Sequence, residues 1–340
     1  MKKTVLFLLK MGLSLGILGF LLYQASQSRD EHGERLLFQL WQNPKDWGAL
    51  GLGFLFSFLA VFFTIGRWWY LMRIQGVRVG FWETLRVGYI GYLFNLAPMG
   101  IVGGDLLKAW LILGKRRGET PMVLASVLVD RLMGLYALFF LASLAILGMG
   151  VLNDPGTSSL LYTLSVAVLA AWGIGTVLWL GMFAYPWYRS RLLQVPEKAK
   201  GTWREIPGKI VRAVWMYRHK PWSVAGVLLS SLGIHALFAI SIYFIATGLW
   251  KEHPTFWQHG YISPTSMSTS AIPLPFGPYE AVLDLFYKDV TGKAGLGLMV
   301  ALAYRIICLL IASLGVLFYF LSRDEVQQTL AEEQNGAMVP

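Results

Sequence analysis

Residues 88–113 read GYIGYLFNLAPMGIVGGDLLKAWLIL, an apolar run that proline and glycine interrupt near its middle. Pro98 lacks a backbone donor and clashes with the preceding turn, so a helix through this stretch must break or kink there. Backbone groups freed by such a break cannot face lipid, and they must be buried in protein or line a wet cavity. The stretch therefore predicts two short helices joined by a break.

The rest of the chain is also strongly apolar. Of its 340 residues, 56% are hydrophobic and only 14% are charged, whereas soluble domains carry about 25% charged residues. Its apolar runs are long enough to cross a hydrocarbon core about 30 Å thick. We predict an all-α, polytopic transmembrane helical bundle with six full spans, near residues 4–23, 48–66, 121–150, 159–184, 223–248 and 294–321.

The first of these runs, residues 4–23, is also compatible with a signal peptide, because Gln24-Ala25-Ser26 resembles a cleavage site. Lys10 interrupts the run, however, and Gly12 and Gly16 provide a small face for helix packing. We expect a retained spanning helix rather than a cleaved segment. The second span is expected to end at Arg67-Trp68-Trp69-Tyr70, an interfacial belt of aromatic and basic residues.

The composition excludes several classes of chemistry. Cys308 is the only cysteine, which excludes disulfides, cysteine metal sites and c-type haem. The sequence contains no phosphate loop, dinucleotide fingerprint or zinc helix in a supporting context, and no nucleophile elbow. We therefore expect no enzymatic activity, no cofactor and no metal site.

Basic residues gather in a few loops and account for the formal charge of +10. This pattern indicates membrane topology and contact with anionic lipids rather than nucleic acid. A cytoplasmic N-terminus places most of them on the cytoplasmic side, provided that residues 84–113 and 260–292 each leave the membrane on the side they entered. We therefore predict one membrane domain, residues 1–322, with two re-entrant segments, a basic cytoplasmic loop at 185–222 and a polar cytoplasmic tail at 323–340.

Within the basic loop, residues 201–220 place apolar side chains near helical spacing, with four bases between them. This pattern is typical of a helix lying on anionic headgroups. A cytoplasmic loop with no further role is an equally good interpretation.

A second interrupted segment, SPTSMSTSAIPLPFGPYEAVLDLFYKDV at residues 263–290, repeats the plan of the first. Pro98 precedes Asp105 by seven residues, and Pro273 precedes Glu280 by seven. Broken helices that enter from opposite sides are typical of inverted-repeat transporters, although kinked helices or loops over the bundle ends would also fit. The residues expected to form the two hairpin turns are Pro98, Gly103, Gly104, Pro273, Pro275 and Gly277.

Charged residues follow both breaks and also lie inside the spans. Asp105 is expected either to cap a helix or to pair with Lys108 on the same face; alternatively, Lys108 and the amides of Gly103-Gly104 hold a phosphate. Arg305 needs an acid, for which Glu280 and Asp284 are candidates. We expect the following residues to line a cavity for a lipid headgroup, or else to form a purely structural network: Asp105, Lys108, Asp130, Arg131, Glu280 and Arg305.

Four motifs occur in order along the chain: Pro98 with Gly103-Gly104-Asp105-Leu106-Leu107-Lys108, the run Asp130-Arg131-Leu132-Met133-Gly134-Leu135, Pro273 with Gly277-Pro278-Tyr279-Glu280, and Tyr304-Arg305. Together they resemble the lysylphosphatidylglycerol synthase transmembrane family, a flippase-like membrane domain of bacteria and archaea. The resemblance covers essentially the whole chain. It implies translocation of a polar lipid between leaflets.

This sequence departs from the family pattern at two places. Lys108 stands where the family usually has arginine, which replaces a bidentate phosphate ligand with a point charge. Phe276 precedes Gly277 where the family usually has paired glycines. Longer members add an aminoacyl-transferase domain; this sequence ends at Pro340, so we expect no lipid aminoacylation by this chain.

The expected function is therefore that of a lipid flippase-like transporter in the cytoplasmic membrane, with both termini cytoplasmic. Its expected partners are membrane lipids, chiefly anionic ones. Association with further copies of the same chain is also compatible with the sequence. Two alternatives are a non-catalytic membrane partner of a glycosyl- or aminoacyl-transferase, and an intramembrane lipid-modifying enzyme with a close pair of carboxylates.

Overall fold

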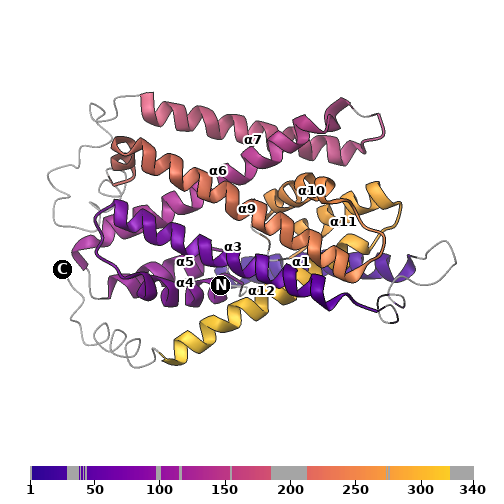
Figure 1. Ribbon diagram of the computed structural model, residues 1–340, viewed down its shortest axis with the longest axis horizontal. Coiled ribbons are helices and arrows are strands. Elements are labelled where there is room, and N and C mark those ends of the chain that lie inside the picture. The colour runs from indigo at the N-terminus through magenta and orange to yellow at the C-terminus, as the bar shows by residue number, and fades with distance from the viewer. Residues whose placement is uncertain are drawn as a thin grey trace. The chain divides into compact units, whose positions relative to one another are not determined.

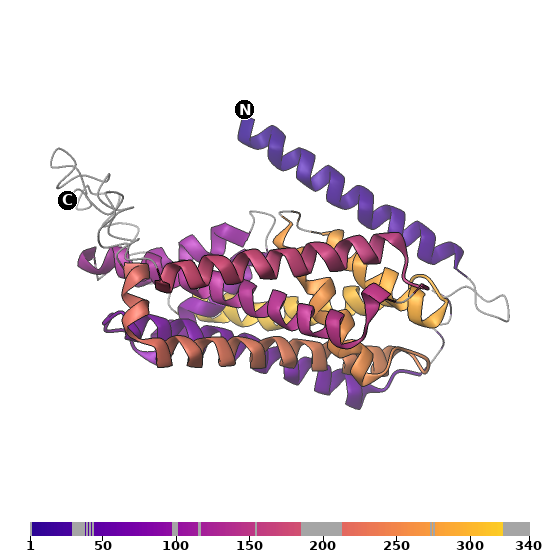
Figure 2. The same ribbon diagram turned by 90° about the horizontal axis from the view of Figure 1, so that it is seen from above.

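The computed structural model describes residues 2–28, 38, 40, 42, 44–96, 101–114, 117–153, 155–184, 213–272, 274 and 276–321. Within these residues all regular secondary structure is helical, and Figure 1 and Figure 2 draw every element as a coiled ribbon. The prediction of an all-helical protein is confirmed.

Five helices in the described part of the chain are long and apolar enough to cross a membrane. They match five of the six predicted spans to within a few residues at most of their ends, and they make this a multi-pass integral membrane protein. The sixth predicted span, residues 4–23, lies within helix α1 (Lys2–Gln27), which is not among the five. The five are α3 (Trp47–Ile74), α6 (Thr120–Gly148), α7 (Ser159–Ala184), α9 (Pro221–Leu249) and α12 (Leu296–Leu321).

Helix α3 is longer than predicted, and the prediction that Arg67 and Trp68 belong to an interfacial belt at its end is wrong. The helix continues through Arg67 and Trp68 to Ile74. Arg67 is only 8% exposed and Trp68 only 1%. A buried arginine is tolerated where an acid compensates its charge, and Asp130 of α6 provides that acid.

Both interrupted segments form two short helices on either side of a break. The first consists of α4 (Phe81–Leu96) and α5 (Ile101–Leu113). The second consists of α10 (Phe256–Ser268), a short 3-10 helix η8 (Thr269–Ala271) and α11 (Pro278–Thr291). Pro98, Pro273 and Pro275 lie outside the described residues. Each segment is divided into separate helices, while re-entry into the membrane stays a prediction.

The glycine pair of the first segment is not part of the turn, contrary to the prediction. Gly103 and Gly104 lie inside α5, which begins at Ile101. A Cβ atom at Gly104 would overlap the backbone oxygen of Gly91 and the side chain of Asn95 in α4. The absence of a side chain at Gly104 therefore allows α5 to pack closely against α4.

Gly277, by contrast, lies at the second break as predicted. Its φ of 112° belongs to a region that glycine adopts readily and other residues rarely do. It immediately precedes Pro278, the first residue of α11, and proline is favoured at that position because its missing N–H has no helical partner there. At the other end of this segment, Thr255 and Gln258 form a capping box that starts α10.

The contacts divide the chain into two compact units. One consists of residues 1–61, 135–175 and 231–308 and contains α10 and α11. The other consists of residues 62–134, 176–230 and 309–340 and contains α4 and α5. Each unit therefore contains one broken-helix hairpin, here called the α4–α5 hairpin and the α10–α11 hairpin.

The described end of the basic loop packs against the C-terminus of α3. Tyr217 donates a hydrogen bond from its hydroxyl to the backbone oxygen of Leu71, at 3.0 Å. The ammonium of Lys220 donates to the backbone oxygen of Ile74 at 2.7 Å, where a positive charge favours the helix dipole. The predicted interfacial helix lies largely outside the described residues, because these resume only at residue 213.

We predict that Gly104→Ala lowers the free energy of unfolding by about 1–3 kcal/mol, because the added methyl group must displace the backbone of α4. The matched control is Gly173→Ala in α7, where a Cβ meets nothing within 4 Å. That variant is expected to be neutral or more stable by roughly 0.5–1 kcal/mol. Thermal unfolding of the purified protein in detergent compares the two, and equal melting temperatures would contradict the close packing of α5 on α4.

Candidate functional site

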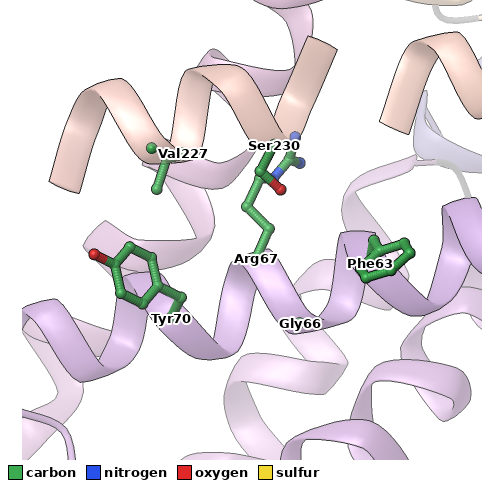
Figure 3. Close-up of a pocket in the computed structure, with 7 residues that line it drawn as sticks. Phe63, Gly66, Arg67, Tyr70, Val227 and Ser230 are labelled. Atoms are coloured by element: carbon green, nitrogen blue, oxygen red, sulfur yellow. The ribbon is translucent and has the colours of Figure 1, made fainter. Parts of the chain in front are cut away.

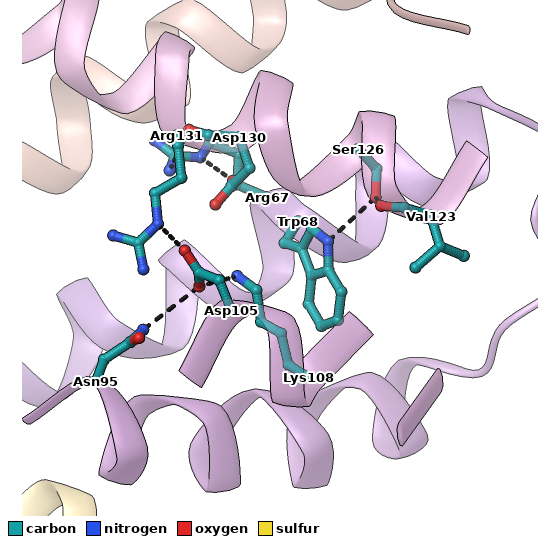
Figure 4. Close-up of polar contacts among 9 residues, drawn as sticks. All are labelled: Arg67, Trp68, Asn95, Asp105, Lys108, Val123, Ser126, Asp130 and Arg131. Carbon is teal, nitrogen blue, oxygen red and sulfur yellow. Dashed lines mark hydrogen bonds and ion pairs between the residues drawn. The ribbon is translucent and has the colours of Figure 1, made fainter. Parts of the chain in front are cut away.

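The first polar cluster surrounds Asp105, a buried residue of α5. Its carboxylate accepts a hydrogen bond from Nε of Arg131 in α6. The ammonium of Lys108 lies 3.1 Å from Oδ1, and the amide nitrogen of Asn95 in α4 lies 3.4 Å from the same oxygen. Figure 4 shows the three partners around the carboxylate. Asp105 therefore joins α5 to both α4 and α6.

This geometry corrects one interpretation of Asp105 and confirms another. Asp105 is four residues beyond Ile101, the first residue of α5, so it does not cap that helix. The predicted ion pair with Lys108 is present. Arg131 was not predicted as a partner, because 26 residues separate it from Asp105 and no local pattern links them.

Lys108 is held from two sides. Besides its pair with Asp105, its ammonium lies 4.5 Å from the ring centre of Trp68, within the range of a cation–π interaction. The indole nitrogen of Trp68 in turn donates to the hydroxyl of Ser126 at 3.2 Å. Lys108 is buried, so it contributes a fixed positive charge behind Asp105.

The side chain of Arg131 is far more exposed than that of Lys108. Although Asp105 is buried, 45% of the Arg131 side chain is exposed. Figure 4 shows its Nε joined to the carboxylate, and within the described residues its hydrogen bond to Asp105 uses Nε and not the two terminal nitrogens. A guanidinium has five N–H donors and suits bidentate binding of phosphate or carboxylate. Arg131 is thus oriented by Asp105 while nearly half of its side chain stays exposed.

Asp130, although adjacent to Arg131, has a different partner. Arg67 of α3 donates from Nε to Oδ1 of Asp130 at 2.9 Å, and both side chains are buried. Nη2 of Arg67 also lies 3.3 Å from the backbone oxygen of Asp130. The structure therefore places Asp130 in an internal ion pair, and Arg67 is a charged residue that the sequence analysis assigned to the interface.

Arg67 also lines a recess of about 250 Å³ in the same unit, shown in Figure 3. The recess lies between α3 and α9, and its lining is mostly apolar. Because Asp130 already balances the charge of Arg67, the recess is a poor site for an anion. Its other lining residues are Phe63, Gly66, Tyr70, Gly226, Val227 and Ser230.

The second polar cluster surrounds Glu280, a buried residue of α11. Its Oε2 accepts a hydrogen bond from the backbone N–H of Gly277 at 2.8 Å, which caps α11. Its Oε1 accepts from Nε of Arg305 in α12, also at 2.8 Å. The prediction that Arg305 pairs with an acid of this segment is confirmed, with Glu280 as that acid.

Arg305 is partly exposed, and aromatic rings lie beside its guanidinium. Its central carbon lies 5.4 Å from the ring centre of Phe276 and 5.7 Å from that of Tyr279. The exposed share of the Arg305 side chain is 28%. Phe276, which directly precedes Gly277, therefore gives the arginine an aromatic contact at the second break.

Asp284, the other acid considered for Arg305, has a different role. Its Oδ1 accepts hydrogen bonds from the backbone N–H groups of Gly295 at 2.8 Å and Leu298 at 3.0 Å. These donors lie at the N-terminus of α12, where a carboxylate satisfies free amides and favours the helix dipole. Asp284 therefore fastens α11 to the start of α12.

The two hairpins thus follow one plan. In each, a buried carboxylate lies beyond a break and receives Nε of an arginine from a later long helix. Arg131 follows Asp105 by 26 residues, and Arg305 follows Glu280 by 25. Both arginines keep part of their side chain exposed.

A buried histidine in the second hairpin was not singled out by the sequence analysis. His259 of α10 lies 2.9 Å from the backbone oxygen of Thr255 through Nδ1 and 2.7 Å from the hydroxyl of Tyr287 through Nε2. Both nitrogens are therefore satisfied within the protein. Among the residues that the structure describes, no three His, Cys, Asp or Glu side chains gather closely enough to hold a metal ion.

The sequence matches the family described as the lysylphosphatidylglycerol synthase TM region over residues 7–315. The chain belongs to this family. Both hairpins and both arginine–carboxylate pairs of this lysylphosphatidylglycerol synthase TM region lie inside the matched range. A search of curated proteins found no match to the chain. Family membership identifies a membrane protein related to lipid handling and confirms the resemblance seen in the four motifs.

We predict that Asp130→Asn lowers the free energy of unfolding by about 3–5 kcal/mol, because it leaves the charge of Arg67 buried without its counter-ion. The matched control is Glu252→Gln, which removes the partner of Lys293 in an exposed pair at 2.8 Å. The Lys293 hydrogen bond lowers the pKa of the Glu252 carboxyl, but exposed pairs contribute little to stability. Unfolding titrations in mixed detergents measure the free energy of unfolding of both variants. Equal decreases would show that the buried Arg67–Asp130 pair stabilises the protein no more than the exposed pair does.

Proposed function

We propose that this protein is a flippase-like transporter that moves a polar or anionic lipid headgroup between the leaflets of the cytoplasmic membrane, with both of its termini in the cytoplasm. The observation that carries the proposal is Arg131, whose guanidinium is fixed by a buried carboxylate while nearly half of the side chain stays exposed. We assign the chain no chemical reaction.

The position of Arg131 supports a role in binding. Arg131 lies about ten residues into the long apolar helix α6, where a charged side chain costs roughly 2.5–3.5 kcal/mol on insertion scales. A charge kept in such a place usually faces a partner or a cavity. Asp105 holds only Nε, so the terminal nitrogens are suitably placed for a phosphate oxygen.

The charge of the cluster favours an anion. Asp105 contributes one negative charge, while Lys108 and Arg131 each contribute a positive one. Lys108 is buried behind Asp105 and cannot reach far outwards, but its charge still adds to the potential at Arg131. The surplus positive charge is suited to the phosphate of a lipid headgroup.

Arg305 is our second candidate for contact with a headgroup. Like Arg131, it presents a partly exposed guanidinium whose Nε is held by a buried carboxylate. Broken helices of this kind are typical of transporters that bind substrate near the middle of the membrane. In our proposal the lipid tails stay in the bilayer, and a gradient or downstream consumption of the lipid drives the movement.

A scrambling assay in proteoliposomes tests this function. A fluorescent phospholipid reports transfer between leaflets when an added reductant bleaches only the outer leaflet. We expect Arg131→Ala to slow transfer at least tenfold relative to wild type, since it removes the exposed donors. The matched control is Lys293→Gln, which removes a positive charge from the exposed pair with Glu252 and should transfer lipid at the wild-type rate.

The Arg131→Ala variant should fold, because Asp105 keeps Lys108 at 3.1 Å and Asn95 at 3.4 Å. Circular dichroism and gel filtration check this. Arg131→Lys keeps the charge without the planar fork and should give an intermediate rate. If wild type and variants are no faster than vesicles without protein, transport is rejected; co-purification with a transferase would then favour the role of a membrane partner.

A further inference from the structure

The recess between α3 and α9 opens on the surface of its unit. Phe63 and Tyr70, which line it, are 48% and 41% exposed, and Gly226 on the opposite wall is exposed as well. Figure 3 shows Tyr70 of α3 beside Val227 of α9. Because both helices are among the five long apolar ones, the recess faces the lipid of the membrane.

The dimensions of the recess match part of one hydrocarbon chain. Its lining residues on α3 extend from Phe63 to Tyr70, about 10 Å along the helix axis. Its volume of about 250 Å³ equals the space of roughly eight water-sized groups. Gly66 and Gly226 contribute no side chain to fill it. The charge of Arg67 in the lining is already balanced by its buried ion pair, so an apolar occupant is favoured.

Basic residues lie beyond one end of the recess. Helix α3 ends at Ile74, one turn after Tyr70, and the ammonium of Lys220 lies 2.7 Å from the backbone oxygen of Ile74. Lys220 directly precedes α9, so its charge lies between the ends of the two helices that frame the recess. The sequence of these ends, residues 68–78 and 213–230, contains no acidic residue and the following bases: Arg73, Arg78, Arg218 and Lys220. This end of the recess is therefore suited to an anion.

An exposed tryptophan indicates the depth of the basic end in the membrane. Trp222, in the first turn of α9, is 89% exposed, and tryptophan is enriched at the level of the lipid headgroups. Gly226 follows four residues later, about 6 Å further along the helix axis. A lipid whose headgroup lies level with Trp222 therefore has its acyl chains level with the recess.

We propose that this recess binds one acyl chain of an anionic phospholipid, with the lipid phosphate beside Lys220. Basic sites between membrane helices are known to bind anionic headgroups. The chain gains van der Waals contacts with walls that otherwise face a void. A free anion would leave the recess empty, and a neutral lipid would leave the basic end without a counter-ion. The site is separate from the headgroup contact at Arg131, and the inference does not depend on lipid transport.

Native mass spectrometry of the purified full-length protein in detergent tests the site by counting bound lipids. The protein is mixed with equal amounts of dioleoylphosphatidylserine, which is anionic, and dioleoylphosphatidylcholine, which has no net charge. We expect wild type to retain phosphatidylserine in preference to phosphatidylcholine. Lys220→Gln keeps a donor for Ile74 but removes the charge, and it should reduce this preference about fivefold. The matched control, Lys293→Gln, removes a base from the exposed pair with Glu252 and should keep the preference.

A second pair of variants tests the recess itself. Gly226→Leu places a side chain in the recess, and a Cβ there meets nothing within 4 Å, so the variant should fold. We expect it to lose one bound phosphatidylserine per protein. The control is Gly233→Leu, seven residues further along α9, where the glycine is also exposed and a Cβ also meets nothing. It lies outside the lining and should keep the lipid. Circular dichroism checks the folding of both variants.

Three results would overturn the proposal. Wild type binds the two lipids equally, or Gly226→Leu and Gly233→Leu retain the same amount of phosphatidylserine, or inorganic phosphate at equal concentration displaces the lipid, which would make the ligand a free anion. Binding at Arg131 is the same within each pair of variants and does not affect the comparison. None of these measurements involves lipid movement, so the proposed function and this site can fail separately.

Discussion

Each broken helix of this protein depends on a buried carboxylate that binds an arginine from a later apolar helix. The pairing lowers the cost of placing both charges among apolar groups, and at Asp105 a second base, Lys108, shares this role. Asp105 attaches α5 to α6 through Arg131, and Glu280 attaches α11 to α12 through Arg305. The pairs fix the short helices in place near the breaks, where the regular hydrogen bonds of the helix backbone are interrupted. Because each arginine binds its carboxylate through Nε, the contact that stabilises the hairpin also orients a partly exposed guanidinium.

Features that depend on composition over a long window could be predicted from the sequence. The long helices match the predicted spans because an apolar run of that length has few other stable conformations. The pair of Glu280 with Arg305 could also be foreseen, because Arg305 had no acid on its own helix and the nearest acids followed the second break. Whether the breaks lead back to the same side of the membrane depends on the surroundings of the chain and stays a prediction.

Features that depend on one distant partner could not be predicted. In the sequence alone, Arg67 has the pattern of an interfacial residue. In the structure, Asp130, 63 residues later, balances its charge inside the unit. In the sequence alone, Gly103 and Gly104 have the pattern of a turn. In the structure, Gly104 allows the backbone of α4 to pack closely against α5. In both cases the local pattern was ambiguous, and a tertiary contact decided the structure. The partner of Arg131 was missed for the same reason, because the sequence offered Asp105 a closer base in Lys108.

The two hairpins share one backbone plan but surround their carboxylates differently. In the first, Lys108 and Arg131 both contact Asp105. In the second, Glu280 contacts Arg305 and the backbone N–H of Gly277. The cluster around Asp105 therefore has one positive charge more than it has negative charges, and this surplus is why Arg131, rather than Arg305, carries the proposed contact with an anionic headgroup.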